Sequence, residues 1–190
     1  MTPMLGIMAS QISGYLVTGA FDSIATVTVG SGGSSTITFT SIPGTYTHLQ
    51  VRGIVRSSNA SSAVGLRSQM GHGSLDTAAN YSSHNLYGDG ATPTAASAPG
   101  VNYMLAGSSP AASLTAGIFG VTILDILDYA NGNKYKTVRD IGGFDANGSG
   151  YAEMDSGVWM SLSTVDTISL FFTAGNFVQY SQLALYGIKG

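Results

Sequence analysis

The segment Asp145-Ala146-Asn147-Gly148-Ser149-Gly150 has the residue types that could bind a hard cation. Side-chain oxygens at alternate positions open a calcium loop, and a bidentate acid closes it at the twelfth position. Counting from Asp145, that position is Ser156, although Glu153 and Asp155 lie close by. A tight hairpin turn needs the same Asp, Asn and Gly residues. We therefore favour a turn over a cation site, and assign no metal ligand.

Two pairs of acidic residues are candidates for catalytic carboxylates, since glycosidases need two carboxylates that flank one bond. Asp125 and Asp128 lie three residues apart at a predicted strand end, where solvation or turn capping is the favoured role. Glu153 and Asp155 lie two residues apart and so share one strand face, where a cation or a partner's arginine are alternatives. Neither pair predicts catalysis, and no catalytic residue is assigned.

Trp159 and the three histidines give weaker signals. Trp159, the only tryptophan, is expected in the core or as an interface anchor rather than as a sugar platform. His48 is expected on an exposed strand face, and His72 and His84 in loops. None has a partner at metal-ligand spacing, so surface or interface histidines are favoured over ligands.

The remaining motifs and the composition exclude several classes of function. The nucleophile elbow, Walker A loop, dinucleotide fingerprint and zincin motif are absent, so we expect no enzyme of these classes and no cofactor. With no cysteine there is no disulfide and no thiolate site. Seven scattered basic residues and a net charge of -3 argue against nucleic acid as a partner. No run approaches the roughly 18 apolar residues of a membrane span. A signal peptide begins with a positively charged region, and the first basic residue here is Arg52, so we expect no signal peptide.

The pattern of short apolar segments and turn clusters predicts an all-β protein. The 26 glycines fit frequent turns, and only 9% of residues are charged. Strands are expected at 22–29, 35–42, 47–56, 63–70, 101–107, 117–127, 135–144, 151–162, 164–173 and 180–189. The first two strands are expected to pair as a hairpin, as are 135–144 and 151–162. Residues 117–127, apolar on both faces, predict a central strand.

The connections and the chain ends complete the predicted organisation. Residues 77–90 are expected to be a connection with a short helical turn, and 91–100 a loop. About eight to ten antiparallel strands fit a jelly-roll β-sandwich best, with a Greek-key sandwich second. We expect one domain at 21–190, preceded by an N-terminal arm at 1–20. An arm with so much apolar surface is expected to dock on its own core or on a neighbour.

Several segments resemble small structural proteins of tailed bacteriophages, including cyanophage-type phages. The most specific are NKYKTVRDIGG and the terminal YGIKG; MLGIMASQISGYL and FDSIATVTVGSGG add to them. The resemblance covers nearly the whole chain. It implies a virion protein without catalytic residues, and a capsid cement (decoration) protein is the favoured interpretation. Such a protein would bind the major capsid protein on the outer capsid surface, and by analogy would form a homotrimer.

The expected work of this protein is therefore adhesion to other chains. The residues predicted to contact a partner are Leu5, Ile7, Met8, Ile12, Tyr15, Leu16 and Trp159. The alternative is a tail-fibre or tail-tip module that binds host-surface carbohydrate through Trp159, loop tyrosines such as Tyr81 and Tyr87, and the Asp145 loop.

Overall fold

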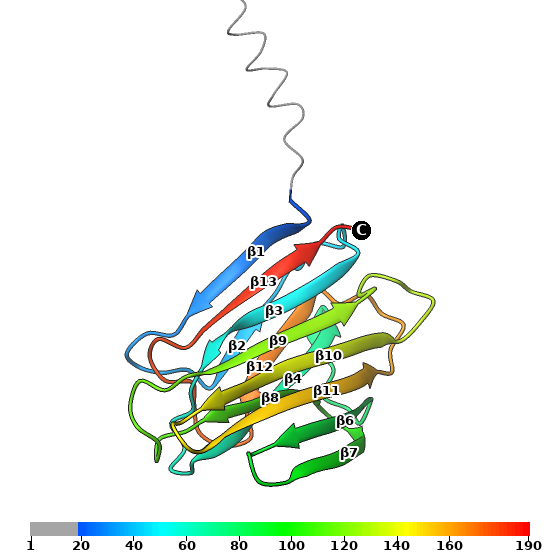
Figure 1. Cartoon of the computed structure of the whole chain (residues 1–190). Coiled ribbons are helices and arrows are strands. Elements are labelled where there is room, and N and C mark those ends of the chain that lie inside the picture. The colour runs from blue at the N-terminus through cyan, green and yellow to red at the C-terminus, as the bar shows by residue number, and fades with distance from the viewer. Residues whose placement is uncertain (1–18) are drawn as a thin grey trace, which may run out of the picture.

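The computed structural model describes residues 19–190, which form thirteen strands in two facing sheets (Figure 1). All strand pairs are antiparallel, and no helix is present in this part of the chain. The predicted all-β sandwich is confirmed. The jelly-roll arrangement stays a prediction. The strands divide into sheets of eight and five, whereas a jelly roll has eight strands in two sheets.

The large sheet has eight strands and faces the viewer in Figure 1. In spatial order they are β1 (Phe21–Thr28), β13 (Gln182–Ile188), β3 (His48–Val55), β9 (Gly120–Leu127), β10 (Lys136–Asp145), β11 (Gly150–Trp159), β6 (Tyr81–Gly88) and β7 (Pro93–Val101). β9 lies in the middle, so the predicted central strand is confirmed. β10 and β11 form the predicted hairpin, with Lys136 opposite Trp159 and Asp145 opposite Gly150.

The smaller sheet lies behind the large one. Its order is β2 (Thr36–Phe39), β12 (Thr167–Phe172), β4 (Ala63–His72) and β5 (Ser74–Leu75), and β8 (Met104–Pro110) also pairs with β4. Alternating burial, most regular in β4 and β10, turns every second side chain toward the space between the sheets. One hydrophobic core fills that space, with Leu49, Leu124 and Ile126 from the large sheet and Leu66, Ile168 and Leu170 from the small one.

The predicted hairpin of residues 22–29 and 35–42 is wrong. β1 pairs with β13 in the large sheet, and β2 pairs with β12 in the small one. The glycine-rich connection, which includes Gly33 at φ 69°, leads from the large sheet to the small sheet instead of forming the turn of a hairpin. Flexible glycines permit both paths, and the distant partner strands decide between them.

Three strands were not among the ten predicted ranges: the short β5, and two strands in segments expected to be connections. Residues 77–90 contain β6, and residues 91–100 contain most of β7. β7 is an edge strand with mostly exposed residues, and it carries Pro93 at its start and Pro99 within it. Edge strands tolerate proline and small polar residues, so composition alone did not distinguish β7 from a loop.

Candidate functional site: the outer face of the large sheet

A row of exposed apolar side chains crosses five neighbouring strands of the large sheet. The strand register places them directly opposite one another: Ile123 on β9, Ile141 on β10, Met154 on β11, Leu86 on β6 and Ala95 on β7. They alternate along each strand with inward-facing residues such as Leu124 and Asp140, so they point away from the core. These five strands therefore present a row of apolar residues on the outer face of the sheet.

A second row runs beside the first. Ile54 on β3 lies opposite Val121 on β9, and the row continues through Gly143 to Ala152. The row on the other side is polar, because Asp125 lies opposite both Gln50 and Arg139 and bonds to each, at 2.8 and 3.2 Å. The apolar rows are therefore bounded by a hydrogen-bonded polar row.

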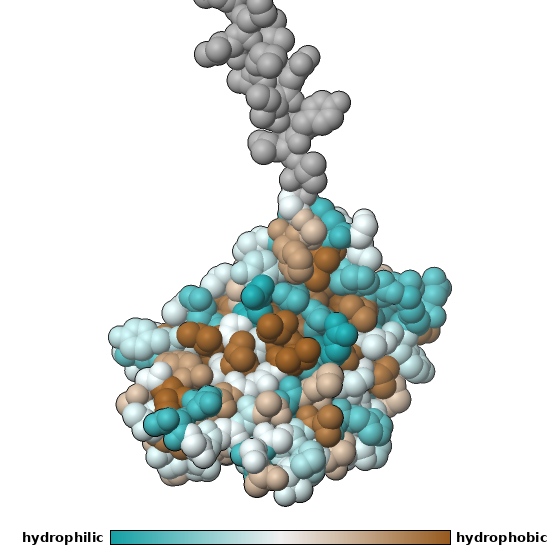
Figure 2. All heavy atoms as spheres, viewed as in Figure 1, coloured by the Kyte–Doolittle hydropathy of each residue, from teal (hydrophilic) through white to brown (hydrophobic). Residues whose placement is uncertain are grey.

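We call Ile54, Leu86, Val121, Ile123, Ile141 and Met154 the apolar outer face. Five of these six, all but Ile123, are between 46% and 54% exposed. Figure 2 shows hydrophobic side chains gathered at the middle of this side of the molecule. Monomeric soluble proteins seldom expose contiguous apolar patches of this kind, which instead mark surfaces that other molecules cover.

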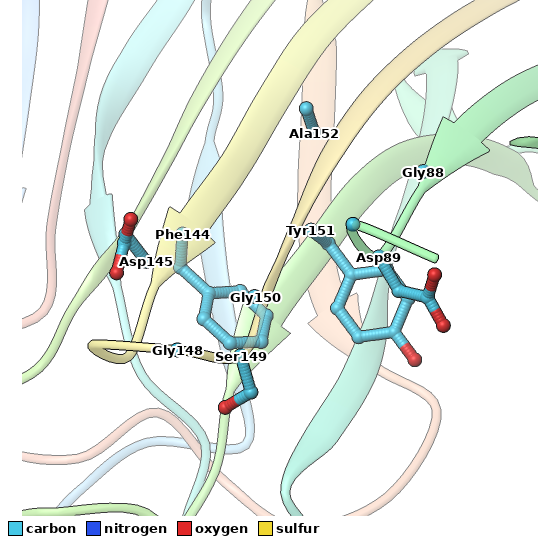
Figure 3. A pocket seen from close by; sticks show the side chains of 10 residues that line it. Gly88, Asp89, Phe144, Asp145, Gly148, Ser149, Gly150, Tyr151 and Ala152 are labelled. Atoms are coloured by element: carbon cyan, nitrogen blue, oxygen red, sulfur yellow. The ribbon is translucent and has the colours of Figure 1, made fainter. Parts of the chain in front are cut away.

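A second surface feature is an open pocket of about 470 Å³ at the β10–β11 hairpin tip. Figure 3 shows Phe144, Tyr151 and Asp89 along it, with Asp145 turned away from Tyr151. The Phe144 and Tyr151 ring centroids are 5.6 Å apart, and Tyr87 lies 5.9 Å from Tyr151. Aromatic faces next to an exposed carboxylate are one way in which proteins bind sugars.

The Asp145 segment forms a tight turn, the favoured interpretation of its sequence. Asn147 and Gly148 both have positive φ, at 58° and 109°, as a type I′ hairpin turn requires. The Asp145 carboxylate accepts a hydrogen bond from the Asn147 N–H at 2.7 Å, and Ala146 N–H donates to Ser149. Within residues 19–190 no group of three or more His, Asp or Glu side chains is arranged to hold a metal ion.

Three carboxylates are buried between the sheets, behind the apolar outer face. Asp140 on β10 lies directly opposite Asp155 on β11, and Glu153 is the next inward residue on β11. Gly107 of β8 covers them: its N–H donates to Asp155 at 2.9 Å, and a Cβ there would lie 2.9 Å from Asp140 Oδ1. Ser108 donates to Glu153 at 2.6 Å. The sequence correctly placed Glu153 and Asp155 on one face, and that face is the inner one.

Two of these carboxylates, Asp140 and Asp155, hold protons more tightly than carboxylates in water. Burial, then the charge of Glu153, raises the pKa of Asp155 to about 7. Burial also raises the pKa of Asp140 well above its ordinary value. Thr122 Oγ1 lies 3.1 Å from the Ala106 carbonyl and 2.7 Å from Asp140 Oδ2. One hydroxyl proton cannot serve both contacts, so both are hydrogen bonds only when Asp140 is protonated.

Trp159 is a core residue, which corrects its prediction as a partner contact. It is 2% exposed and stacks on Tyr81 at 6.3 Å. Its Nε1 donates to Asp76 Oδ2 at 2.8 Å. Because Trp159 and Tyr81 are both buried, neither offers the open ring face that a sugar platform needs. Of the aromatic side chains named for carbohydrate, Tyr87 alone lies beside the hairpin-tip aromatics.

The other polar candidates have structural partners. His48 Nδ1 accepts the Asp128 N–H at 2.9 Å, and His72 lies 3.0 Å from Asp166. Both histidines predicted in loops lie in strands: His84 is exposed on β6, and His72 is the last residue of β4. Asp128 adopts φ 49° at the turn after β9 and pairs with Lys134, in agreement with the predicted turn role. No catalytic pairing of Asp125 with Asp128 is formed, because Asp125 points into the polar row.

The other predicted partner contacts lie outside the described residues. They are Leu5, Ile7, Met8, Ile12, Tyr15 and Leu16. Nothing in residues 19–190 forms a helix with the length and apolar character that a bilayer crossing requires.

Comparisons with protein-family models, curated proteins and solved structures gave no match. The likeness to phage structural proteins is thus a matter of the sequence segments alone.

Proposed function

We propose that this chain is a non-enzymatic structural protein that adheres to other protein subunits through its apolar outer face. The observation that carries the proposal is the pair of exposed rows across β3, β9, β10, β11 and β6, which consist of apolar and small residues and meet a charge at Arg52, opposite Ile123 on β3. Their side chains stand on a hydrogen-bonded sheet, so the surface is rigid before it meets a partner. A rigid surface loses little conformational entropy on binding.

The proposed setting is the virion of a tailed phage, where the chain decorates the outer capsid surface and binds the major capsid protein. The sequence resemblance supports the setting, and the sparse charge and the apolar face support the role. Binding to the assembled shell would stabilise it by mass action. No reaction is part of this role.

Placing lysines on the apolar outer face tests the proposal. Ile141→Lys combined with Met154→Lys is expected to weaken binding to particles that lack the protein by at least about tenfold, because the contact would bury unpaired charge. The measurement is occupancy on purified particles by sedimentation, over a range of protein concentrations.

The matched control is Thr137→Lys. It adds one lysine, the charge of each single substitution, on the exposed side of β10 beyond the polar row, and should leave binding unchanged. Wild-type occupancy by the double lysine variant would exclude the apolar outer face as the binding surface. Circular dichroism of each variant checks that the fold is retained.

A tail module that binds host-surface carbohydrate is the second candidate, and the hairpin-tip pocket is the observation that favours it. Under this alternative, Tyr151→Ala should abolish glycan-array binding, because Tyr151 contacts both Phe144 and Tyr87. Tyr180→Ala, at a 66% exposed tyrosine outside the pocket, is the control. An array on which the wild-type protein binds no glycan removes this candidate.

A further inference from the structure

The apolar outer face selects for an occupant of a particular chemistry. The strands that carry it are hydrogen-bonded on both sides, so they offer no free backbone edge for strand addition. None of its six side chains is charged, small residues such as Gly143 and Ala152 lie among them, and the one charged side chain in register with them is Arg52, at the β3 margin. A suitable occupant therefore binds through apolar side chains and brings no charge into the contact.

Residues 1–18 of this chain have that chemistry. They contain no Asp, Glu, Lys, Arg or His, and the first charged side chain in the sequence is Asp22. Their large apolar residues are Met1, Met4, Leu5, Ile7, Met8, Ile12, Tyr15, Leu16 and Val17. Each copy thus carries one uncharged apolar segment and one uncharged apolar face, in equal number.

The point where the described chain begins favours a neighbouring copy over the same copy. Phe21 pairs with Ile188, and Lys189 N–H donates to the Ala20 carbonyl, which fixes the start of β1 at a corner of the large sheet (Figure 1). The register places the two apolar rows level with Thr26 and Thr28, at the other end of β1. Residues before Gly19 would have to reverse direction to reach their own face.

A neighbour's face requires no such reversal and lies within reach. Eighteen residues span up to about 60 Å when extended. A domain of this size has a radius of gyration of about 16 Å, so the segment is long enough to cross the sheet of an adjacent copy. Segment-to-face contacts join two different surfaces, and such head-to-tail contacts close into rings when the rotation permits.

We infer that the apolar outer face binds residues 1–18 of a second copy of this chain, so that copies assemble head to tail. This inference rests on the proposed function, adhesion through the apolar outer face, and names a second copy of this chain as the subunit that covers the face. The major capsid protein would then contact another surface of the assembled copies. It accounts for the apolar outer face and for the apolar composition of residues 1–18 with one contact.

Complementation between two full-length variants tests the inference. The face variant carries Ile141→Lys and Met154→Lys, and the segment variant carries Ile7→Asp and Ile12→Asp. The wild-type protein should sediment as an oligomer, and each variant alone as a monomer. A mixture should form a 1:1 heterodimer, because the face variant keeps its segment and the segment variant keeps its face. The control variant Thr137→Lys should sediment as an oligomer of the same mass as the wild-type oligomer.

Other outcomes overturn the inference and are distinguishable from failure of the proposed function. A monomeric wild-type protein, or a mixture that stays monomeric, would exclude head-to-tail assembly. If that monomer still loses particle binding on Ile141→Lys and Met154→Lys, the face binds another protein and only the inference fails. Should the double variant unfold by circular dichroism, Leu86→Lys repeats the test at one site that is half exposed.

Discussion

Replacing Trp159 with alanine is expected to lower the free energy of unfolding by about 3–5 kcal/mol, in the range for truncating a buried aromatic. The substitution removes the ring that packs on Tyr81 and leaves a cavity between the sheets. It also removes the indole N–H that donates to Asp76, whose carboxylate keeps its bonds from Asn80 and Ala78. Urea denaturation at pH 7, followed by circular dichroism, measures the change.

Trp159→Phe separates the two contributions, since it keeps most of the packing and removes the indole hydrogen bond. A loss of about 1–2 kcal/mol is expected for this variant. Tyr180→Ala, at an exposed position, should change stability by less than about 0.5 kcal/mol. If Trp159→Ala cost no more than this control, Trp159 would not be a core residue.

The second large effect is a loss of stability as pH rises. Asp155 has a pKa near 7 in the folded chain and an ordinary value of 3.8 when unfolded. Between these values the folded state holds a proton that the unfolded state has released, so the contribution of Asp155 to stability is greatest below about pH 4 and is lost as pH rises through 7. The expected fall from this group is of the order of 2 kcal/mol, and protonated Asp140 changes stability in the same direction.

Asp155→Asn is expected to reduce this fall and to make the protein more stable than wild type at pH 8. An asparagine stays neutral, and its side-chain oxygen can accept the Gly107 N–H that Asp155 accepts now. The test compares urea midpoints of the two proteins at pH 5 and pH 8. Asp125→Asn, on the opposite face of the sheet beside Arg139, is the control that should keep the wild-type fall. Parallel pH profiles for Asp155→Asn and wild type would show that Asp155 is ionised in the folded protein throughout this range.

The sequence was sufficient for the fold class but not for all of the strand pairing. Alternation of apolar and polar residues in 47–56 located β3 and its buried face, and the turn-flanked segments 135–144 and 151–162 located the β10–β11 hairpin. Pairing of β1 with β13 joins residues more than 150 positions apart, and no local pattern encodes such a partner. β7 was not predicted because an exposed edge strand has no apolar face, and therefore shows no alternating pattern in the sequence.

The apolar outer face was missed for a related reason. Apolar residues on both sides of 117–127 correctly indicated a central strand, but suggested that both sides were buried. Val121 and Ile123 instead belong to the outer face. In β11 the usual alternation is inverted, with Glu153 and Asp155 inward and Met154 outward. The sequence pattern of β11 therefore does not indicate its buried face. The structure does, because Gly107 of β8 packs on the inner face and donates to Asp155.

The prolines of β7 limit strand addition at this edge of the large sheet. An edge strand with free N–H groups can recruit the edge of another molecule and extend into fibres without end. Pro93 and Pro99 have no N–H to offer, and Pro99 falls where the pairing with β6 is irregular. Open-ended polymerisation through the β7 edge is thereby discouraged.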